Sequence, residues 1–130
     1  MKRAGFAVLA WLLPGGGYLL LRRYGRFAAW LALVSAAAIA GLMLQGGNLW
    51  PDPAELQGLD GVATLLARAG ALAKAAAGAP YVLARMAGYA QPYIAGCVHE
   101  YGTALLTIAG LINLLAIADA WELRRAEDRA

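Results

Sequence analysis

The sequence predicts an all-α integral membrane protein, and its composition and two long apolar runs are the observations that predict it. Of its 130 residues, 62% are hydrophobic and 15% are charged, whereas about 25% of residues are charged in an average soluble protein. Residues 27–44 and 103–121 are apolar almost throughout, and each is close to the roughly 20 residues with which a helix crosses a bilayer core about 30 Å thick. We therefore expect two transmembrane helices in a single membrane domain over residues 1–130, followed by a tail over 122–130.

The apolar segment that precedes them, residues 4–21, contains a helix-breaking sequence at its centre. Pro14 lacks a backbone donor, and the glycines that follow it are conformationally free. A straight helix over 4–21 is therefore disfavoured, and we expect a broken or re-entrant segment that turns at Pro14, Gly15, Gly16 and Gly17. A kinked full span is the alternative.

The positions of Lys and Arg choose between these alternatives, because basic residues near membrane ends favour the cytoplasm. If residues 4–21 turn back, the two N-terminal basic residues, the three at 22–26 and the three in the tail all lie inside, which places eight inside and three outside. If the segment spans with the N-terminus outside, the division is six to five. The sequence therefore predicts a multi-pass protein of the inner (cytoplasmic) membrane with both termini in the cytoplasm.

Residues 52–91 are predicted to form extracytoplasmic amphipathic helices between the two spans. Asp52, Pro53 and Glu55 provide a capping box with proline at the first helical position, which predicts a helix start. Glycines 58 and 61 are expected to interrupt this helix, and Gly78 and Pro80 to stop and restart the next. Polar residues then follow one face of 61–78 and apolar residues the other, namely Asp60, Thr64, Arg68 and Lys74 against Val62, Leu65, Leu66, Ala69 and Ala73.

We expect these helices to lie shallowly at the outer interface or to contact a partner. A third span over residues 62–77 is the alternative. Arg68 and Lys74 argue against it, since each would cost about 2.5–3.5 kcal/mol at the centre of a lone membrane helix.

Small residues recur at four-residue spacing in the first span and predict a helix-packing surface. In lipid, small side chains let helix backbones approach closely. The stripe either closes the two spans into a hairpin or docks a larger membrane protein. Asn113, near mid-membrane, is expected to find a hydrogen-bond partner and to act as packing glue. The predicted packing residues are Ala28, Ala32, Ala36, Ala40, Gly110 and Asn113.

The supply of reactive side chains predicts a protein that is not an enzyme. The chain has one serine, Ser35, one cysteine, Cys97, and one histidine, His99, and Cys97 and His99 are two residues apart, so they do not face each other on a helix. No metal site is predicted, because zinc needs repeated ligands at suitable spacing. His99 is the one candidate cofactor ligand, for a haem or chlorophyll held from one side, and no cofactor is expected otherwise.

The basic residues of the chain flank apolar segments, which indicates membrane topology and not nucleic-acid binding. Arg22, Arg23 and Arg26 are candidates for binding anionic lipid headgroups, each worth about 1 kcal/mol near an anionic surface. A role as a positive-inside anchor alone is the simpler interpretation. Asp119 is expected to pair with one of these three arginines.

The stretch AWLLPGGGYLLLRRYGRFAAW resembles the opening of small bacterial two-transmembrane-domain proteins, in which an apolar segment with a Pro-Gly-x-Gly turn leads to an aromatic residue, a leucine and a basic pair. The stretch YGTALLTIAGLINLLAIADAWELRR is similar to the end of an uncharacterised bacterial family with that opening. Together they cover about residues 8–35 and 100–125. The resemblance implies a small integral membrane protein and supplies no catalytic residue.

These observations predict an accessory or scaffolding subunit of a larger bacterial membrane complex, whose partners are membrane lipids and other integral membrane subunits. A cofactor- or pigment-holding subunit using His99 is one alternative. A lipid-binding protein using Arg22, Arg23 and Arg26 is the other.

Overall fold

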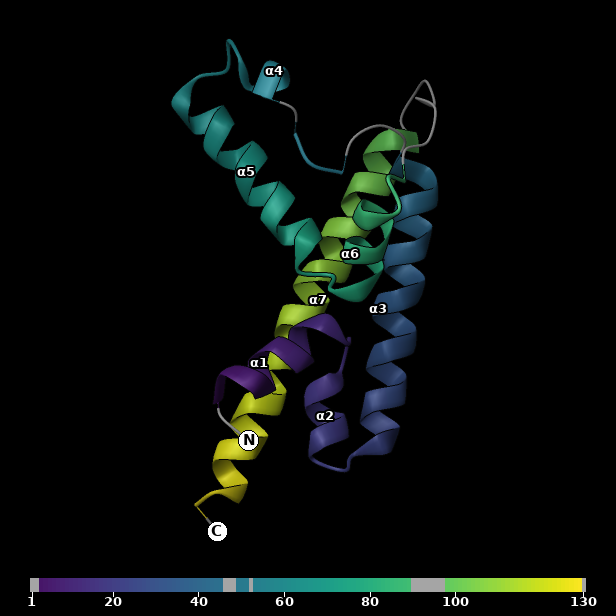
Figure 1. Ribbon diagram of the computed structural model, residues 1–130, viewed down its shortest axis with the longest axis vertical. Coiled ribbons are helices and arrows are strands. Elements are labelled where there is room, and N and C mark those ends of the chain that lie inside the picture. Colours follow the sequence, from purple (N-terminus) through teal and green to yellow (C-terminus); the bar gives the residue numbers. More distant parts are fainter. Residues whose placement is uncertain (1–2, 46–48, 52, 90–97, 130) are drawn as a thin grey trace.

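The protein is all-helical wherever the structure describes it. A computed structural model describes residues 3–45, 49–51, 53–89 and 98–129, and within these ranges it contains no strand. Figure 1 shows α3 and α7 running together along the long axis, with both chain ends at the end where α1 and α2 lie. The helices are α1 (Arg3–Leu12), α2 (Gly16–Leu20), α3 (Tyr24–Gln45), α4 (Pro53–Leu56), α5 (Gly61–Ala75), α6 (Ala79–Met86) and α7 (Val98–Glu127).

Helices α3 and α7 are the two candidate membrane spans, and the all-helical structure of the described residues confirms the predicted fold class. Residues Tyr24–Leu44 and Glu100–Glu127 are each long and apolar enough to cross a bilayer. The two helices pack against each other and diverge towards the end where the chain termini lie (Figure 1), and they approach closely at Gly41. A Cβ atom on Gly41 would lie 2.7 Å from the backbone nitrogen of Leu106. The absence of a side chain there lets the two backbones come together.

The N-terminal segment reverses direction at its Pro-Gly sequence, as predicted. The ring of Phe6 packs edge-on against Trp121 of α7, with centroids 5.7 Å apart, and Trp11 reaches Asn113, two turns deeper on α7. Helix α1 has ten residues and is therefore about 15 Å long, half the thickness of a bilayer core. Helix α2 then returns towards the chain termini, so that α1 and α2 form a re-entrant hairpin.

The connection from α2 to α3 is a tight turn closed by two backbone hydrogen bonds. Arg23 N–H donates to the carbonyl of Tyr18 at 2.9 Å and Arg22 N–H to that of Leu19 at 3.1 Å, which is the Schellman pattern. Arg22 occupies the left-handed position with φ of 56°, where glycine is usual. The turn therefore forms without the glycine, and a bulky charged residue accepts the left-handed backbone.

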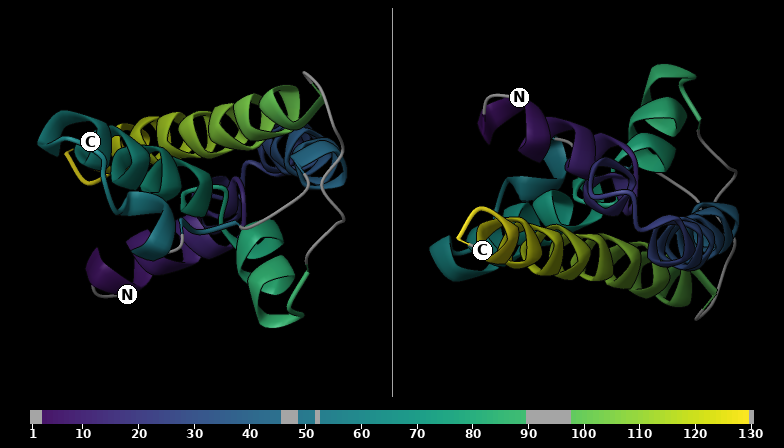
Figure 2. Two further views of the ribbon diagram at one scale, coloured as in Figure 1. Left: turned by 90° about the horizontal axis from the view of Figure 1, so that it is seen from above. Right: turned by 90° about the horizontal axis from the view of Figure 1, so that it is seen from below.

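Helices α5 and α6 form a bent pair that, by length and composition, is either a broken span or a re-entrant loop, and we call it the second hairpin. The Asp60 carboxylate caps α5 by accepting from Ala63 N–H at 2.6 Å. The two helices are bent by 104° at their break, where Gly78 has φ of 78° and Pro80 restarts the helix. In the end-on views of Figure 2, α6 and α1 lie on the same side of α7.

This arrangement differs from the expected shallow seating of residues 52–91. Only the α4 end of this region lies at the far end of the molecule, whereas the α5–α6 junction packs against the middle of α7 through Gly110, where a Cβ atom would lie 1.8 Å from the Ala73 carbonyl oxygen. The apolar face of α5 is turned outwards, and Leu65 and Leu66 are each 67% exposed. In a bilayer this face contacts lipid. Helix α4 begins at Pro53 as predicted, while its expected cap, Asp52, lies outside the described residues.

Substituting Gly110 by alanine tests the contact that holds the second hairpin against α7. The added methyl group has no room beside the Ala73 carbonyl, so we expect the free energy of unfolding to fall by about 2 kcal/mol, as overpacking typically costs. Gly70→Ala is the matched control, because a Cβ at Gly70 meets nothing within 4 Å. Thermal unfolding in detergent, followed by circular dichroism, compares the two. Equal stability of both variants would contradict the packing described here.

Candidate functional site

The two hairpins meet at Asn113, whose side chain lies fully buried in α7. Its Nδ2 group donates both hydrogens, one to the carbonyl of Trp11 at 3.1 Å and one to that of Ala76 at 2.9 Å. Trp11 lies in the last turn of α1 and Ala76 is the C-cap of α5. One amide therefore holds the tips of both hairpins at a single point on α7.

The helix breaks are the reason these carbonyls need an external donor. Within an α-helix, a carbonyl accepts from the N–H four residues later. For Ala76 that residue is Pro80, which has no N–H. For Trp11 it is Gly15, which lies beyond the end of α1 with φ of 75°. Backbone groups at membrane depth must be paired within the protein, and Asn113 supplies both donors.

The tips also contact each other directly. The indole N–H of Trp11 donates to the Ala75 carbonyl at 3.2 Å. A Cβ atom on Gly78 would lie 2.2 Å from the Trp11 carbonyl oxygen, so only glycine fits there. Together with Asn113, these contacts form what we call the tip junction: Trp11, Ala75, Ala76, Gly78 and Asn113.

The tip junction contains one buried acceptor without a partner among the described residues, and the end of α5 carries a buried lysine. Asn113 Oδ1 accepts no hydrogen bond from the described part of the chain. Lys74, two residues from Ala76, is only 8% exposed and takes part in an interaction of its own. The prediction placed Lys74 on a polar outer face, and this is wrong, because the end of α5 packs against α7 and encloses it.

A second polar cluster lies nearer the chain termini and joins α2, α3 and α7. The Tyr18 hydroxyl donates to Asp119 Oδ2 at 2.5 Å, and Arg26 Nη1 lies 3.5 Å from the same oxygen. The Tyr18 ring stacks on Trp30, with centroids 6.4 Å apart and planes inclined by 6°. Asp119 therefore anchors the returning arm of the first hairpin to both spans.

The predicted basic cluster lies at this end and is partly engaged in ion pairs. Arg26 forms the expected pair with Asp119, and Arg23 lies 3.5 Å from Glu127. Both pairs are half-exposed, so each is worth at most about 1 kcal/mol. Arg22 is exposed at the tight turn. The three arginines therefore brace this end of the fold, and their binding to lipid stays a prediction.

The predicted packing residues divide between two surfaces. Gly110 and Asn113 lie at the contact between α7 and the hairpin tips. On α3, however, the face buried against α7 comprises Val34, Ala38 and Gly41. The alanine stripe does not close the two spans, since its first three members are exposed and the fourth is partly buried: Ala28, Ala32, Ala36 and Ala40.

The predicted turn residues lie where the first hairpin reverses, and all four are buried: Pro14, Gly15, Gly16 and Gly17. A Cβ atom on Gly17 would lie 2.6 Å from the Cβ of Ala120, so this turn also packs closely against α7. Cys97 and the side chain of His99 lie outside the described residues, and the proposed cofactor ligand stays a prediction. Within the described ranges, no three His, Cys, Asp or Glu side chains gather as a metal site would require.

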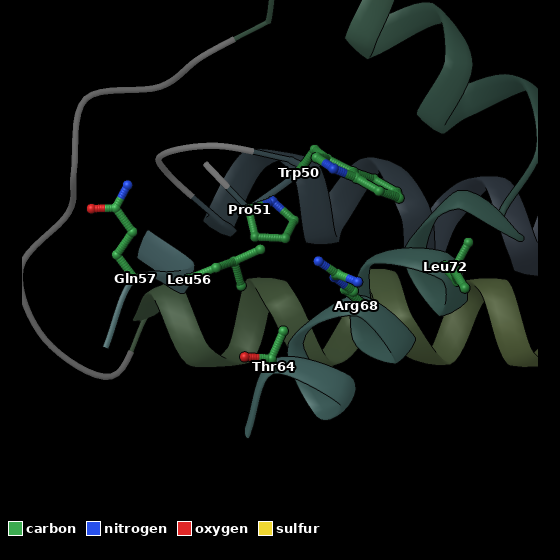
Figure 3. Close-up of a pocket in the computed structure, with 7 residues that line it drawn as sticks. All are labelled: Trp50, Pro51, Leu56, Gln57, Thr64, Arg68 and Leu72. Carbon is green, nitrogen blue, oxygen red and sulfur yellow. The ribbon is translucent and has the colours of Figure 1, made fainter. Parts of the chain in front are cut away.

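Two cavities that sequence reasoning missed are formed by residues distant along the chain. The first, of about 680 Å³, lies between α4 and α5. Figure 3 shows Trp50, Pro51 and Leu56 facing the α5 residues Thr64, Arg68 and Leu72 across it. The second, of about 540 Å³, is an apolar groove between α3, the two turn prolines and α6. No short motif in the sequence marks either one.

Replacing Asn113 by leucine tests the tip junction. The variant keeps a similar side-chain volume but leaves the Trp11 and Ala76 carbonyls without a donor. We expect a loss of about 1 kcal/mol in the free energy of unfolding, since hydrogen bonds between membrane helices contribute about 0.6 kcal/mol each on average. Hydrogen exchange should rise together at residues 12–17 and 76–80. Faster exchange at only one hairpin would contradict the shared role of Asn113.

Comparison with known proteins places the whole of this architecture in one family. No curated protein and no solved structure matches the chain. A family model matches residues 5–129, so the match includes both hairpins, both spans and the central region that the motif resemblance left uncovered. The chain belongs to the family of unknown function DUF6677.

Proposed function

We propose that this membrane protein is a non-enzymatic accessory or scaffolding subunit of a larger complex in the bacterial inner membrane. In this proposal the outward face of α3 receives a transmembrane helix of another subunit. The observation that carries it is that Ala28, Ala32 and Ala36, three members of the alanine stripe of α3, are exposed.

The stripe is suited to a helix partner because Ala28, Ala32 and Ala36 form one row along α3. Small side chains in such a row allow a second helix to approach closely, and the resulting van der Waals contact drives association in lipid. The contact with α7 is made by the other face of α3, through Val34 and Ala38. The stripe is therefore available to a partner without any rearrangement of the fold.

The apolar groove beside the stripe supports the same occupant. Its walls include Leu31, Ser35 and Ile39 of α3, which lie next to the stripe on the helix surface, and Pro14 and Pro80 from the two hairpin turns. A flat stripe flanked by a groove matches a helix that carries one or two large apolar side chains. Hydrocarbon chains of lipid fill a groove but gain nothing from the adjoining stripe.

The chemistry of this surface supports a role without catalysis. Ser35, the one serine of the chain, faces a groove whose other described lining residues are apolar apart from Tyr89. A serine nucleophile needs an adjacent general base. Among the described residues that line this groove there is neither a histidine nor a carboxylate to activate the hydroxyl.

A bulky substitution in the alanine stripe of α3, read out by crosslinking, tests the proposal. With a photo-crosslinking amino acid at Leu33, which is 52% exposed beside the stripe, we expect one crosslinked product in native membranes, formed with a different integral membrane protein. Ala32→Leu should reduce its yield about tenfold, as a clash costing about 1.4 kcal/mol implies. Ala118→Leu, at an exposed alanine of α7, is the control and should leave the yield unchanged. A crosslink only between two copies of this chain, or none, would refute the subunit proposal.

Cysteine labelling tests the proposed orientation. In a Cys97→Ser background, single cysteines at Gly5 and Arg125 should both be protected from a membrane-impermeant maleimide in intact cells, because both ends of the chain lie at the same end of the molecule beside the basic cluster. A cysteine at Gln57, at the other end, should react. Reaction at Gly5 or Arg125 would overturn the cytoplasmic assignment of the termini.

A further inference from the structure

We propose that the cavity between α4 and α5 binds an anionic phospholipid from the leaflet opposite the chain termini, with Arg68 as the ligand of its phosphate. The site is distinct from the Arg22, Arg23 and Arg26 cluster at the other end of the molecule. The inference goes beyond the proposed function and does not depend on it.

The cavity has a polar part and an apolar part that follow one ridge of α5. Thr64, Arg68 and Leu72 are spaced four residues apart, so they lie on the same helix face, and Figure 3 shows all three lining the cavity. The opposite wall is formed by Trp50, Pro51 and Leu56. A hydroxyl and a guanidinium thus lie on the α5 side, followed one turn later by a leucine, in a cavity that is otherwise mostly apolar.

Arg68 is the one charged side chain among the described residues that line the cavity, so the lining favours an anion. Arg68 is exposed and forms no ion pair with the residues that the structure describes. A second guanidinium, that of Arg85, lies 5.2 Å from the centre of the Trp50 ring. Both cations therefore border the same tryptophan. A guanidinium binds phosphate through two parallel hydrogen bonds, which a lone ammonium does not provide.

The depth of Arg68 in the membrane indicates that the anion belongs to a lipid. The tip junction at Ala76 lies near the middle of α7, and Arg68 lies eight residues before Ala76 on α5, about 12 Å along a helix. Half of a bilayer core is about 15 Å, and α5 is inclined to α7 (Figure 1), so the backbone of Arg68 lies within the core and its long side chain reaches towards the headgroup boundary. Leu72 lies one turn deeper, among acyl chains. Trp50 lines the same cavity as Arg68 (Figure 3), and tryptophan is enriched at membrane interfaces.

A guanidinium at this depth is costly unless a counter-charge accompanies it. A phosphodiester at the headgroup boundary supplies that charge, and its acyl chains cover Leu72 and Leu56. A free phosphate ion satisfies the arginine but leaves the apolar part of the cavity unfilled. The combination therefore favours a lipid over a soluble anion.

Native mass spectrometry of the full chain, released from micelles with equal phosphatidylglycerol and phosphatidylcholine, tests this site. We expect the wild-type chain to retain phosphatidylglycerol preferentially. Arg68→Gln should reduce that retention about fivefold or more, as loss of one basic contact worth about 1 kcal/mol implies. Arg68→Lys, which keeps the charge but loses the paired hydrogen bonds, should fall between them. Circular dichroism checks that each variant is folded.

Arg129→Gln is the matched control, because it removes the same charge from an exposed position at the opposite end. Its retention of phosphatidylglycerol should equal that of the wild type. An equal fall in both variants would show a general charge effect and overturn the site, as would a wild-type chain without preference for phosphatidylglycerol. Displacement of the lipid by millimolar glycerol phosphate would assign the site to a soluble anion and refute the lipid proposal.

Discussion

The pairing of Asn113 with two backbone carbonyls is the interaction on which the rest of the structure depends. Each hairpin reverses inside the membrane and leaves the end of a helix without its usual donors. Trp11 and Ala76 are far apart in the chain, yet their carbonyls accept from the same amide at 3.1 and 2.9 Å. Because lipid offers no hydrogen bonds, this amide allows two half-depth helices to exist where only complete spans are otherwise stable. The positions of both hairpins on α7 follow from the need to pair these two carbonyls.

The fold also depends on the close approach of helix backbones to α7. Glycines permit this approach at three positions along α7. Gly41 admits α3 beside Leu106, Gly110 admits the end of α5, and Gly17 admits the first hairpin beside Ala120. In water such contacts are accompanied by stabilisation from the hydrophobic effect, whereas in lipid the van der Waals contact of close packing is itself the stabilising interaction. The bundle therefore has few large buried side chains. It is built from alanine and glycine surfaces that leave its leucines facing lipid.

The sequence predicts much of this fold, because length, hydropathy and helix breakers act locally. The two spans, the reversal at Pro14, the start of α4 at Pro53 and the break at Gly78 all follow from short segments. The second hairpin does not. The free-energy cost of placing Arg68 and Lys74 in a lone membrane helix led to the prediction that this segment stays out of the membrane core. Lys74 is instead buried by packing against α7, which no local sequence pattern encodes. Likewise, α3 has two small-residue faces, and only the contact with Leu106 selects the one at Val34 and Ala38. The cavities beside Arg68 and Ser35 arise from contacts of the same distant kind.

The sequence separation within the tip junction has a consequence for biosynthesis. Trp11 and Asn113 are 102 positions apart, and a ribosome that adds about 5–20 residues per second needs roughly 5–20 s to make that length of chain. During this interval the first hairpin lacks the Asn113 donor. The Trp11 carbonyl therefore acquires its buried hydrogen bond only after α7 has been synthesised.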